Sequence, residues 1–352
     1  MHSALSPTTL PGEVIAGWRL APDSVRPLGA GLINRTFLAS TFDGDERVVQ
    51  QVNPVFPPAV NDDIEAVTAH LAASGLATPR LVRTETGALC LPHAGGAWRA
   101  LTRVHGRSLD TLANARQAAS AGALLARFHR ALDDLAREFA HQRQPIHELS
   151  RHLDALRAAL DEQHGHRLYD RAARLATEIL AAANGLDALP PTPPRVVHGD
   201  PKISNVVFAQ LDDAALCLVD LDTLGRMALP LELGDALRSW CNAAGEDTAT
   251  GRFSVALFAA AVRGYAHEAE GWVTATEREA LVPATATIQV ELAARFCADA
   301  LRERYFGWDP QRFPSRGEHN LVRAAGQLSV HRALLDVRGE LERAVLAAFH
   351  AT

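Results

Sequence analysis

Three short polar side chains that could bind a metal ion lie within one stretch of the sequence, residues 195–222. Asp200 precedes Asn205 by five residues, and Asp220 follows a short apolar run. Two carboxylates and a carboxamide form a hard, oxygen-rich set of ligands. Mg²⁺ prefers such ligands and usually takes one or two carboxylates, which leaves room for phosphate oxygens. The stretch therefore predicts a magnesium and phosphate site, provided that the fold brings the three side chains together.

A β-hairpin would bring these residues together. Two runs rich in apolar and β-branched residues, 205–210 and 216–219, flank a short polar break. This pattern predicts two antiparallel strands joined by a four-residue loop. The register that pairs the residues nearest the turn places Asn205 opposite Asp220. Asp200 then lies on the loop that enters the hairpin, at the same end of the apolar ribbon.

The same spacing is typical of a catalytic loop for phosphoryl transfer, in which a metal-binding Asp follows on a later strand. Asp200 would accept or orient the proton of the acceptor hydroxyl, and Asn205 and Asp220 would bind the metal. Lys202 could reach the transferring phosphate, and Asp222 could bind a second metal or support the first. Each residue alone is explained equally well as a turn cap or a strand end. The joint spacing favours the chemical interpretation.

Two neighbouring polar residues have structural explanations. We predict that His198 hydrogen-bonds backbone groups beside the loop rather than taking part in catalysis. Asp235 follows a Pro/Leu turn and a glycine, so an N-terminal helix cap explains it. It could also brace the catalytic loop.

The composition indicates a globular protein with one large or two modest domains. The chain has 352 residues, 47% of them hydrophobic and 22% charged, and a net charge of −6. No block of Lys or Arg is present, so we expect no nucleic acid partner. The four cysteines lack metal-type spacing and predict free thiols in a reducing cytoplasm. We expect no signal peptide, no membrane span, and a monomer or homodimer.

The pattern of elements predicts a small β-rich unit followed by a large helical one. Residues 20–104 contain several strand-like runs and one helical run, 62–74. From residue 114 the composition changes to long Ala- and Leu-rich amphipathic segments, such as 115–139 and 276–304. The predicted hairpin interrupts these helices. Ligand sites favour the junction between two such units.

A Gly-x-Gly sequence in the first unit is a candidate phosphate loop. Gly29 and Gly31 stand between two strand-like runs, where they permit a tight turn and a close approach of backbone N–H groups to an anion. Two glycines alone are explained more simply as a structural turn.

Several blocks together resemble a known family. The sequences HGDPKISN and VDLD resemble the catalytic loop and metal-binding strand of the aminoglycoside phosphotransferase/choline kinase superfamily. Further blocks are similar to its N-acetylhexosamine 1-kinase branch: GAGLINRTFL, AWRALTRVHGRSLD, LLARFHRAL, ELGDALRSWCN, ELAARFCADALRERYF and EHNLVRAAGQL. The resemblance implies an α+β, two-lobed protein-kinase-like fold. It places a nucleotide-binding lobe at residues 1–104 and a catalytic, substrate-binding lobe at 105–352.

The resemblance also implies the reaction and its cofactors. ATP and Mg²⁺ would supply the γ-phosphate, and the anomeric hydroxyl of an N-acetylhexosamine would accept it. By position, Asp200 is the base, and Asn205 and Asp220 are the metal ligands. The implied phosphate loop consists of Gly29, Gly31 and Asn34, and the implied sugar-binding residues are Arg295, Asp299, Tyr305, His319 and Asn320.

One departure from the kinase pattern concerns the nucleotide. The third strand of a kinase normally supplies a Lys to the phosphates, whereas alignment here offers Gln51. Arg35 or Arg47 could supply the missing charge. The acid expected on the following helix is ambiguous among Asp62, Asp63 and Glu65.

Three alternatives remain open at the level of sequence. The chain could phosphorylate another small alcohol, such as an aminoglycoside, an amino alcohol or a different sugar. It could also be a nucleotide-binding pseudokinase, which the absent lysine favours and the intact Asp200, Lys202, Asn205 and Asp220 oppose. Arg295 and the acid four residues later could form a surface ion pair on a helix rather than a sugar site.

Overall fold

The computed structural model describes residues 9–29, 34–93, 96–140 and 146–350 and divides into two compact units. The first unit comprises Met1–His105 with Ala136–Gln142, and the second comprises Gly106–Leu135 with Arg143–Thr352. This division groups Ala136–Gln142 with the first unit, whereas the predicted boundary between the lobes lies after residue 104. Gly31 lies outside the described residues.

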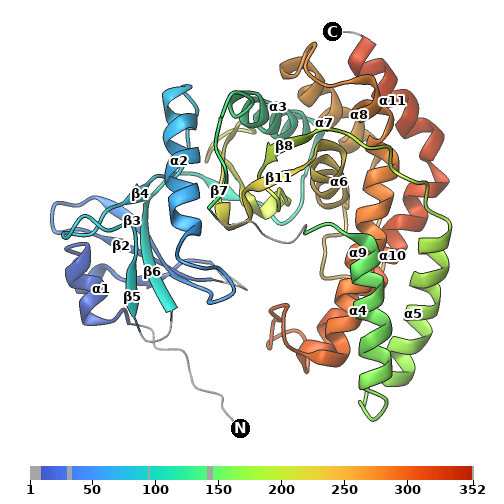
Figure 1. Cartoon of the computed structure of the whole chain (residues 1–352), viewed down its shortest axis with the longest axis horizontal. Coiled ribbons are helices and arrows are strands. Elements are labelled where there is room, and N and C mark those ends of the chain that lie inside the picture. Colours follow the sequence, from blue (N-terminus) through green and yellow to red (C-terminus); the bar gives the residue numbers. More distant parts are fainter. Residues whose placement is uncertain (1–8, 30–33, 94–95, 141–145, 351–352) are drawn as a thin grey trace. The chain divides into compact units, whose positions relative to one another are not determined.

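The first unit is built on an antiparallel sheet with a helix on either face (Figure 1). The strand order is β1-β2-β3-β6-β4, and β5 also pairs with β6. The strands are β1 (Arg26–Pro27), β2 (Arg35–Ser40), β3 (Glu46–Val52), β4 (Leu81–Val82), β5 (Leu91–His93) and β6 (Gly96–Thr102). The helices are α1 (Gly12–Gly17) and α2 (Val60–Ala73).

Alternation along the strands gives the sheet two different faces. Phe37, Val49 and Trp98 point to the face that packs against Val14 and Trp18 at α1, and this face is an apolar core. The opposite face carries polar side chains opposite α2, which are described with the site below.

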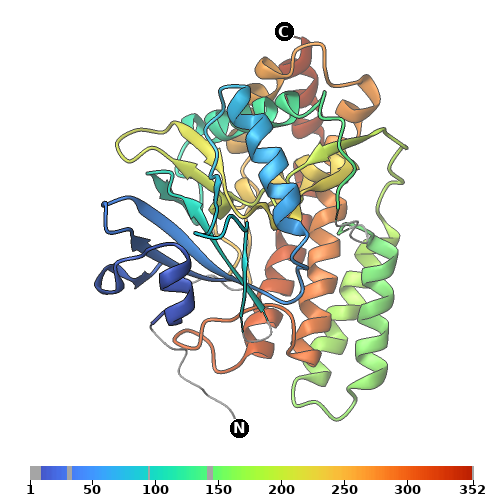
Figure 2. The ribbon, with the colours of Figure 1, turned by 60° about the vertical axis from the view of Figure 1, so that its left-hand side comes forward.

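The second unit is mainly helical. Its helices are α3 (Ala115–Ala131), α4 (Leu149–Glu162), α5 (Tyr169–Asn184), α6 (Leu229–Trp240), α7 (Val255–Glu268), α8 (Ala275–Glu279), α9 (Leu281–Arg302), α10 (Arg316–Asp336) and α11 (Arg338–His350). Its strands are β7 (Arg107–Ser108), β8 (Pro194–Val197), β9 (Val206–Phe208), β10 (Ala215–Leu218) and β11 (Gly225–Ala228). The long helix α9 packs against α4, α5, α6 and α10, several of which run beside it (Figures 1 and 2). This organisation confirms the predicted α+β class.

Two predicted helices differ from the observed ones. The helix expected over 115–139 ends at Ala131, and in the segment beyond it Arg137 and Ala140 hydrogen-bond Asp63. The helix expected over 276–304 is split between α8 and α9. Pro283 requires this break, since a proline is tolerated only in the first turn of a helix. No helix in the described part of the chain is both long and apolar enough to cross a bilayer.

Glycines allow α3 and α7 to pack with their backbones in close contact. A Cβ on Gly264 would lie 2.0 Å from the carbonyl oxygen of Ala119, and one on Gly122 would lie 2.1 Å from that of Ala261. Both distances are far shorter than any real contact, and the obstructing atoms are backbone. Side chains at these positions would push the two helices apart.

We therefore expect Gly264→Ala to destabilise the protein by about 1–3 kcal/mol through overpacking. Urea unfolding monitored by circular dichroism measures this loss. Gly165→Ala is the matched control, because a Cβ there meets nothing within 4 Å. An equal stability for the two variants would contradict the close packing of α3 on α7.

Candidate active site in the helical unit

The predicted hairpin is present, with a register that differs from the predicted one. Val206 pairs with Leu218, and the amide of Val219 donates to the carbonyl of Asn205 at 2.9 Å. Asn205 is therefore opposite Val219, and Asp220 lies one residue further on. The prediction of an Asn205–Asp220 pair was wrong because the turn begins earlier than expected: the amide of Ala209 donates to the carbonyl of Ala214, and Ala215 pairs with Phe208. The irregularity between Ala215 and Cys217 recovers one of the two residues of this shift. The two side chains still lie at the same end of the hairpin.

Two nitrogen donors hold the carboxylate of Asp200. Lys202 Nζ forms a salt bridge with Oδ2, and Asn205 Nδ2 lies 3.2 Å from the same oxygen and 2.8 Å from the Asp200 carbonyl. About a quarter of the Asp200 side chain remains exposed. Burial alone would lower the pKa of Lys202, but the charges of Asp200 and Asp220 outweigh it and raise this pKa. Lys202 therefore stays protonated between two carboxylates.

Asp220 has a backbone conformation that is unusual for a side-chain-bearing residue. Its φ and ψ are 65° and 56°, in the left-handed region. Such conformations are costly and occur mainly where the surrounding structure holds a ligand or catalytic group in place. The 3₁₀ helix η3 (Leu221–Thr223) follows at once and buries Asp222.

These residues fit a hard divalent cation. Because Asn205 Nδ2 faces Asp200, its Oδ1 is directed away and can serve as a metal ligand. Asp220, one residue beyond the position opposite Asn205, adds a carboxylate. Magnesium usually takes only one or two carboxylates from the protein, so these two side chains could be sufficient. Among the described residues no group of three His, Cys, Asp or Glu side chains forms a metal site. A metal here would depend on Asn205 as well as on acids.

A buried glutamate that we did not predict holds the catalytic loop in place through hydrogen bonds to its backbone. Glu232 on α6 accepts hydrogen bonds from the amides of His198, at 2.9 Å, and Gly199, at 3.0 Å. His129 Nε2 lies 3.4 Å from the same carboxylate. Burial acts to raise the pKa of Glu232, but the hydrogen bond and charge of His129 and the loop contacts lower it overall. Glu232 is therefore held ionised under the loop.

His198 and Gly199 complete this anchor. The imidazole lies 2.9 Å from the carbonyl of Val219 through Nε2 and accepts the Asp200 amide through Nδ1 at 3.3 Å. His198 thus binds backbone groups, as predicted. Gly199 has φ +84°, and a Cβ there would lie 2.3 Å from the carbonyl oxygen of Thr223. Only glycine fits this position.

Helix α6 also supports the loop through its last turn. Trp240 Nε1 donates to the carbonyl of Pro201 at 2.8 Å, and Ser239 Oγ accepts from the amide of Ile203. Asp235 does not cap this helix, because Pro230 starts α6 earlier. It instead pairs with Arg238 at 2.8 Å inside the helix.

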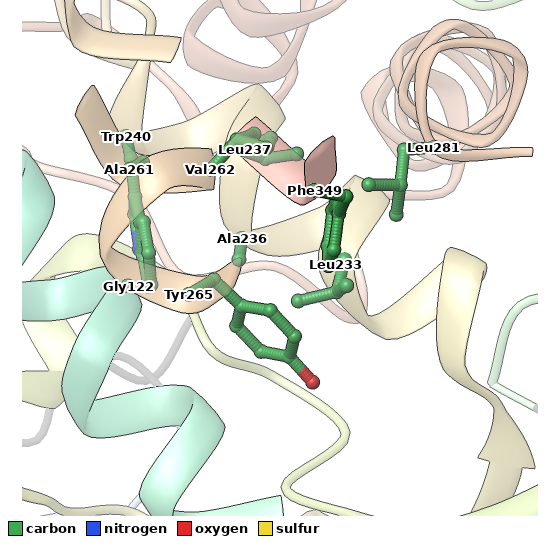
Figure 3. A pocket seen from close by; sticks show the side chains of 10 residues that line it. All are labelled: Gly122, Leu233, Ala236, Leu237, Trp240, Ala261, Val262, Tyr265, Leu281 and Phe349. Carbon is green, nitrogen blue, oxygen red and sulfur yellow. The ribbon is translucent and has the colours of Figure 1, made fainter. Parts of the chain in front are cut away.

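An apolar pocket lies between α6 and residues of α3, α7, α9 and α11 (Figure 3). It is lined by Gly122, Leu233, Ala236, Leu237, Trp240, Ala261, Val262, Tyr265, Leu281 and Phe349. The Tyr265 hydroxyl is its main polar group, and it hydrogen-bonds His129 Nδ1 at 2.8 Å. None of the lining residues carries a charge, so the pocket is part of the core rather than the place of the chemistry.

The residues predicted to bind the nucleotide lie in the first unit. Gly29 has φ +69°, and a Cβ at this position would meet nothing within 4 Å. Asn34 accepts the amide of Asn53 at 2.9 Å and so ties the start of β2 to the end of β3. Its side chain organises the strands beside Gly29.

The strand register changes the candidate for the missing lysine. Gln50, not Gln51, points to the same sheet face as α2, and a one-residue shift along a strand reverses the face. Gln50 Oε1 accepts from Arg99 Nε at 2.9 Å and Nη2 at 2.7 Å. Arg99 Nη1 also reaches Asn61 on α2, at 3.5 Å. Gln51 instead binds Arg35 on the other face, at 3.1 Å.

Arg99 is therefore a buried cation that sequence reasoning missed. It lies on β6, not on β3, within an otherwise apolar run. The single charge in that run was its only signal. Two of the three acids considered on α2 have other partners, since Asp63 binds Arg137 at 2.9 Å and Glu65 lies 3.7 Å from Arg80.

The predicted substrate residues cluster where α9 ends and α10 begins. Asp299 accepts four hydrogen bonds, from the amides of Arg304, Tyr305 and Phe306 and from Asn320 Nδ2. Its carboxylate organises the loop after α9. Arg295 has its salt bridge with Glu291, at 3.7 Å, so the considered Arg295–Asp299 ion pair is not formed.

His319 is held by Asp247, a residue that the sequence pattern did not indicate. His319 Nε2 lies 2.8 Å from Asp247 Oδ1, and its ring stacks on Phe313. Burial acts to raise the pKa of Asp247, but His319 and Arg323 lower it well below its usual range. Tyr305 is half exposed beside this cluster.

Replacing the loop anchor tests its role in stability. We expect Glu232→Gln to destabilise the protein by about 2–4 kcal/mol at neutral pH, because the new amide opposes two backbone N–H groups. Since folding lowers the pKa of Glu232, its contribution is present above the usual carboxyl range and is lost as the pH falls. The difference from the wild type in urea unfolding should therefore shrink at acidic pH. The control is Glu178→Gln, whose exposed pair with Arg332 contributes little; an equal loss in both variants would refute the anchor.

The fold and the family are known from comparisons with other proteins. A family model described as the phosphotransferase enzyme family matches residues 24–277. The aminoglycoside phosphotransferase of Alicyclobacillus acidocaldarius is 17% identical, with coverage of 97% of this chain and 99% of that one and a TM-score of 0.62. A microcompartment-associated aminopropanol kinase is 14% identical, with coverage of 93% and 97% and a TM-score of 0.61.

A third similar structure is an amicoumacin kinase in complex with AMP-PNP, Ca²⁺ and Ami. It is 15% identical, with coverage of 90% of this chain and 91% of that one and a TM-score of 0.60. At these identities the structural matches establish the fold alone, whereas the family model spans well over half of the chain. The chain therefore belongs to the phosphotransferase enzyme family and is a small-molecule phosphotransferase.

Proposed function

We propose that this protein transfers the γ-phosphate of ATP to the anomeric hydroxyl of an N-acetylhexosamine. The observation that carries the proposal is the arrangement of Asp200, whose carboxylate is held by Lys202 and Asn205 on a loop anchored to Glu232. Phosphoryl transfer depends mainly on positioning and on compensation of charge. This arrangement supplies both.

Asp200 is the proposed base. The hydrogen bond from Asn205 and the salt bridge from Lys202 orient its Oδ2, and the exposed part of the carboxylate can accept the proton of an acceptor hydroxyl. Lys202 is the proposed cation beside the transferring phosphoryl group. Its protonated state, enforced by Asp200 and Asp220, suits that role.

Asn205 and Asp220 are the proposed metal ligands, with Asp222 as a supporting carboxylate. When bound, Mg²⁺ would neutralise charge on the phosphate oxygens. The similar amicoumacin kinase holds AMP-PNP and Ca²⁺, which supports a nucleotide donor and a divalent metal here. For the nucleotide we propose Gly29, Asn34 and the polar face of the first unit's sheet, where Gln50 and Arg99 take the place expected for Gln51.

The sugar assignment rests on the resemblance of the sequence blocks to the hexosamine 1-kinase branch. Arg295 and Tyr305 are the proposed sugar-binding residues, because both keep some exposure, Arg295 on α9 and Tyr305 in the loop that follows this helix. Asp299, His319 and Asn320 would act indirectly, by shaping the loop that bears Tyr305.

A second acceptor class has support from the comparisons. The aminopropanol kinase with a similar fold is named for an amino alcohol. A small alcohol other than a hexosamine is therefore the competing proposal for this chain.

Removing the base tests the catalytic assignment. We expect Asp200→Ala to lower kcat by at least about a hundredfold, which is the usual contribution of a positioned base, while ATP affinity is retained. A coupled assay of ADP release measures turnover, and calorimetry measures nucleotide binding. Asp212→Ala, an exposed aspartate on the same hairpin, is the matched control. Near-wild-type turnover in the Asp200 variant would eliminate it as the base.

An acceptor panel separates the two substrate proposals. We expect ATP-dependent phosphorylation of N-acetylglucosamine or N-acetylgalactosamine, with loss of the reducing end in the product. The panel would include hexoses, aminopropanol and an aminoglycoside, and phosphorus NMR would identify the phosphorylated position. Preference for an amino alcohol would reject the sugar assignment.

A further inference from the structure

Lys202 follows the proposed base by two residues, and its backbone is held on both sides by the last turn of α6. The carbonyl of Pro201, in the peptide group before Lys202, accepts a hydrogen bond from Trp240 Nε1 at 2.8 Å. The amide of Ile203, in the peptide group after Lys202, donates to Ser239 Oγ at 3.0 Å. Two neighbouring residues of one helix therefore bind the two peptide groups that flank Lys202.

These two hydrogen bonds fix the direction in which the Lys202 side chain leaves the backbone. A peptide group is planar, so a residue between two fixed peptide groups retains little freedom in φ and ψ. From this backbone, Lys202 Nζ reaches Asp200 Oδ2 in a salt bridge. The Lys202 carbonyl also accepts the amide of Asn205 at 2.9 Å, in the short 3₁₀ helix η2 (Ile203–Asn205). The position of the ammonium group therefore depends on a backbone that α6 holds.

The surroundings of the Trp240 indole favour its hydrogen bond to the loop. Trp240 is 2% exposed and lines the apolar pocket together with Ala261 and Val262 of α7 (Figure 3). An indole N–H buried among apolar side chains is costly unless it has a hydrogen-bond acceptor. The carbonyl of Pro201 is that acceptor, so a movement of the loop away from Trp240 would leave two buried polar groups unpaired.

Contacts within the helical unit keep the last turn of α6 in place. Arg238 precedes the two hydrogen-bonding residues and is 5% exposed. Its Nε lies 2.8 Å from Asp235 Oδ1 in the same helix, and its Nη1 lies 2.6 Å from Glu246 Oε1 beyond the helix end. Gly234 brings α6 close to α9, since a Cβ there would lie 2.9 Å from the carbonyl carbon of Ala284. The turn that holds the loop is therefore itself fixed by packing and buried ion pairs.

Helix α6 thus holds the catalytic loop on both sides of Asp200. Glu232, near the start of the helix, accepts the amides of His198 and Gly199, which precede Asp200. The last turn holds the peptide groups that follow Asp200. Because the two attachments use different residues, the second can be loosened while the first stays intact.

We propose that Ser239 and Trp240 are positioning residues for phosphoryl transfer, which act by holding Lys202 beside the transferring phosphoryl group. This inference rests on the proposed function, because it takes Lys202 as the cation that compensates charge on that group. Phosphoryl transfer depends mainly on positioning and charge, and a displacement of about 1 Å can lower a rate about a hundredfold. Because both residues act through Lys202, their loss should lower kcat and leave the binding of ATP and of the acceptor nearly unchanged.

Removing the Ser239 hydroxyl tests the proposal. We expect Ser239→Ala to lower kcat about tenfold with KM values changed less than about twofold, and Ser239→Thr, which keeps the hydroxyl, to restore most of the rate. Trp240→Phe, which removes the N–H but keeps an aromatic ring, should give a similar loss. ADP release with N-acetylglucosamine and with aminopropanol measures turnover, and thermal melting confirms folding. The matched control is Ser120→Ala, because Ser120 Oγ on α3 accepts the amide of Ala215 at 2.8 Å near the turn of the hairpin, and its kcat should stay at the wild-type value.

A double variant shows whether Ser239 acts through Lys202. We expect Lys202→Met to lower kcat at least about a hundredfold, and Ser239→Ala to lower it less than about twofold further in that background, because residues that act through one group are not additive. A full tenfold further loss, or a wild-type kcat in Ser239→Ala alone, would overturn the inference and leave the proposed function standing. Wild-type turnover in Lys202→Met would reject Lys202 as the phosphoryl cation and the inference with it. Phosphorylation of aminopropanol but not of the sugar would reject the sugar assignment alone, since the same comparison is then made with aminopropanol.

Discussion

The hydrogen bonds to the buried carboxylate of Glu232 are the constraint on which the active-site loop depends. A carboxylate without solvent is costly unless donors surround it, and here the donors are two consecutive loop amides and His129. Because the donors are backbone groups, the carboxylate fixes the path of the chain immediately before Asp200. If the loop moved, the buried carboxylate of Glu232 would lose its hydrogen-bond donors. The precision of the site therefore originates in α6.

The hairpin supplies the second half of the site, and its strain is consistent with this. Val219 binds both His198 Nε2 and Asn205 through its backbone, so the loop and the hairpin are joined at one residue. The chain must then turn sharply, and Asp220 takes a left-handed conformation that costs about 1–3 kcal/mol. Only a well-anchored neighbourhood can sustain that cost. The strained backbone of Asp220 therefore depends on the hydrogen bonds that Glu232 makes to the neighbouring loop.

Local patterns predicted the elements better than the contacts between them. The alternation of apolar residues identified the hairpin, and the spacing of Asp200 and Asn205 identified the loop. The register was missed because the exact start of the turn leaves no clear mark in composition, and one residue decides which side chains face each other. Glu232 and Arg99 were missed for a different reason. Each is a charged residue whose partners come from distant parts of the sequence, and such pairing is visible only after folding.

The pairing of acids with arginines explains why the net charge of this protein misleads. A charge of −6 suggests acidic surfaces that attract cations. In the helical unit, however, Arg238 takes up Asp235 and Glu246, and Arg323 and His319 take up Asp247. These acids serve the packing of α6, α10 and the segment between them, and each is paired with a neighbouring cation. What remains near Asp200 is an ammonium and a metal-type oxygen set, which suits a phosphate donor whatever the acceptor. The acceptor must then be chosen by local contacts, not by the overall charge.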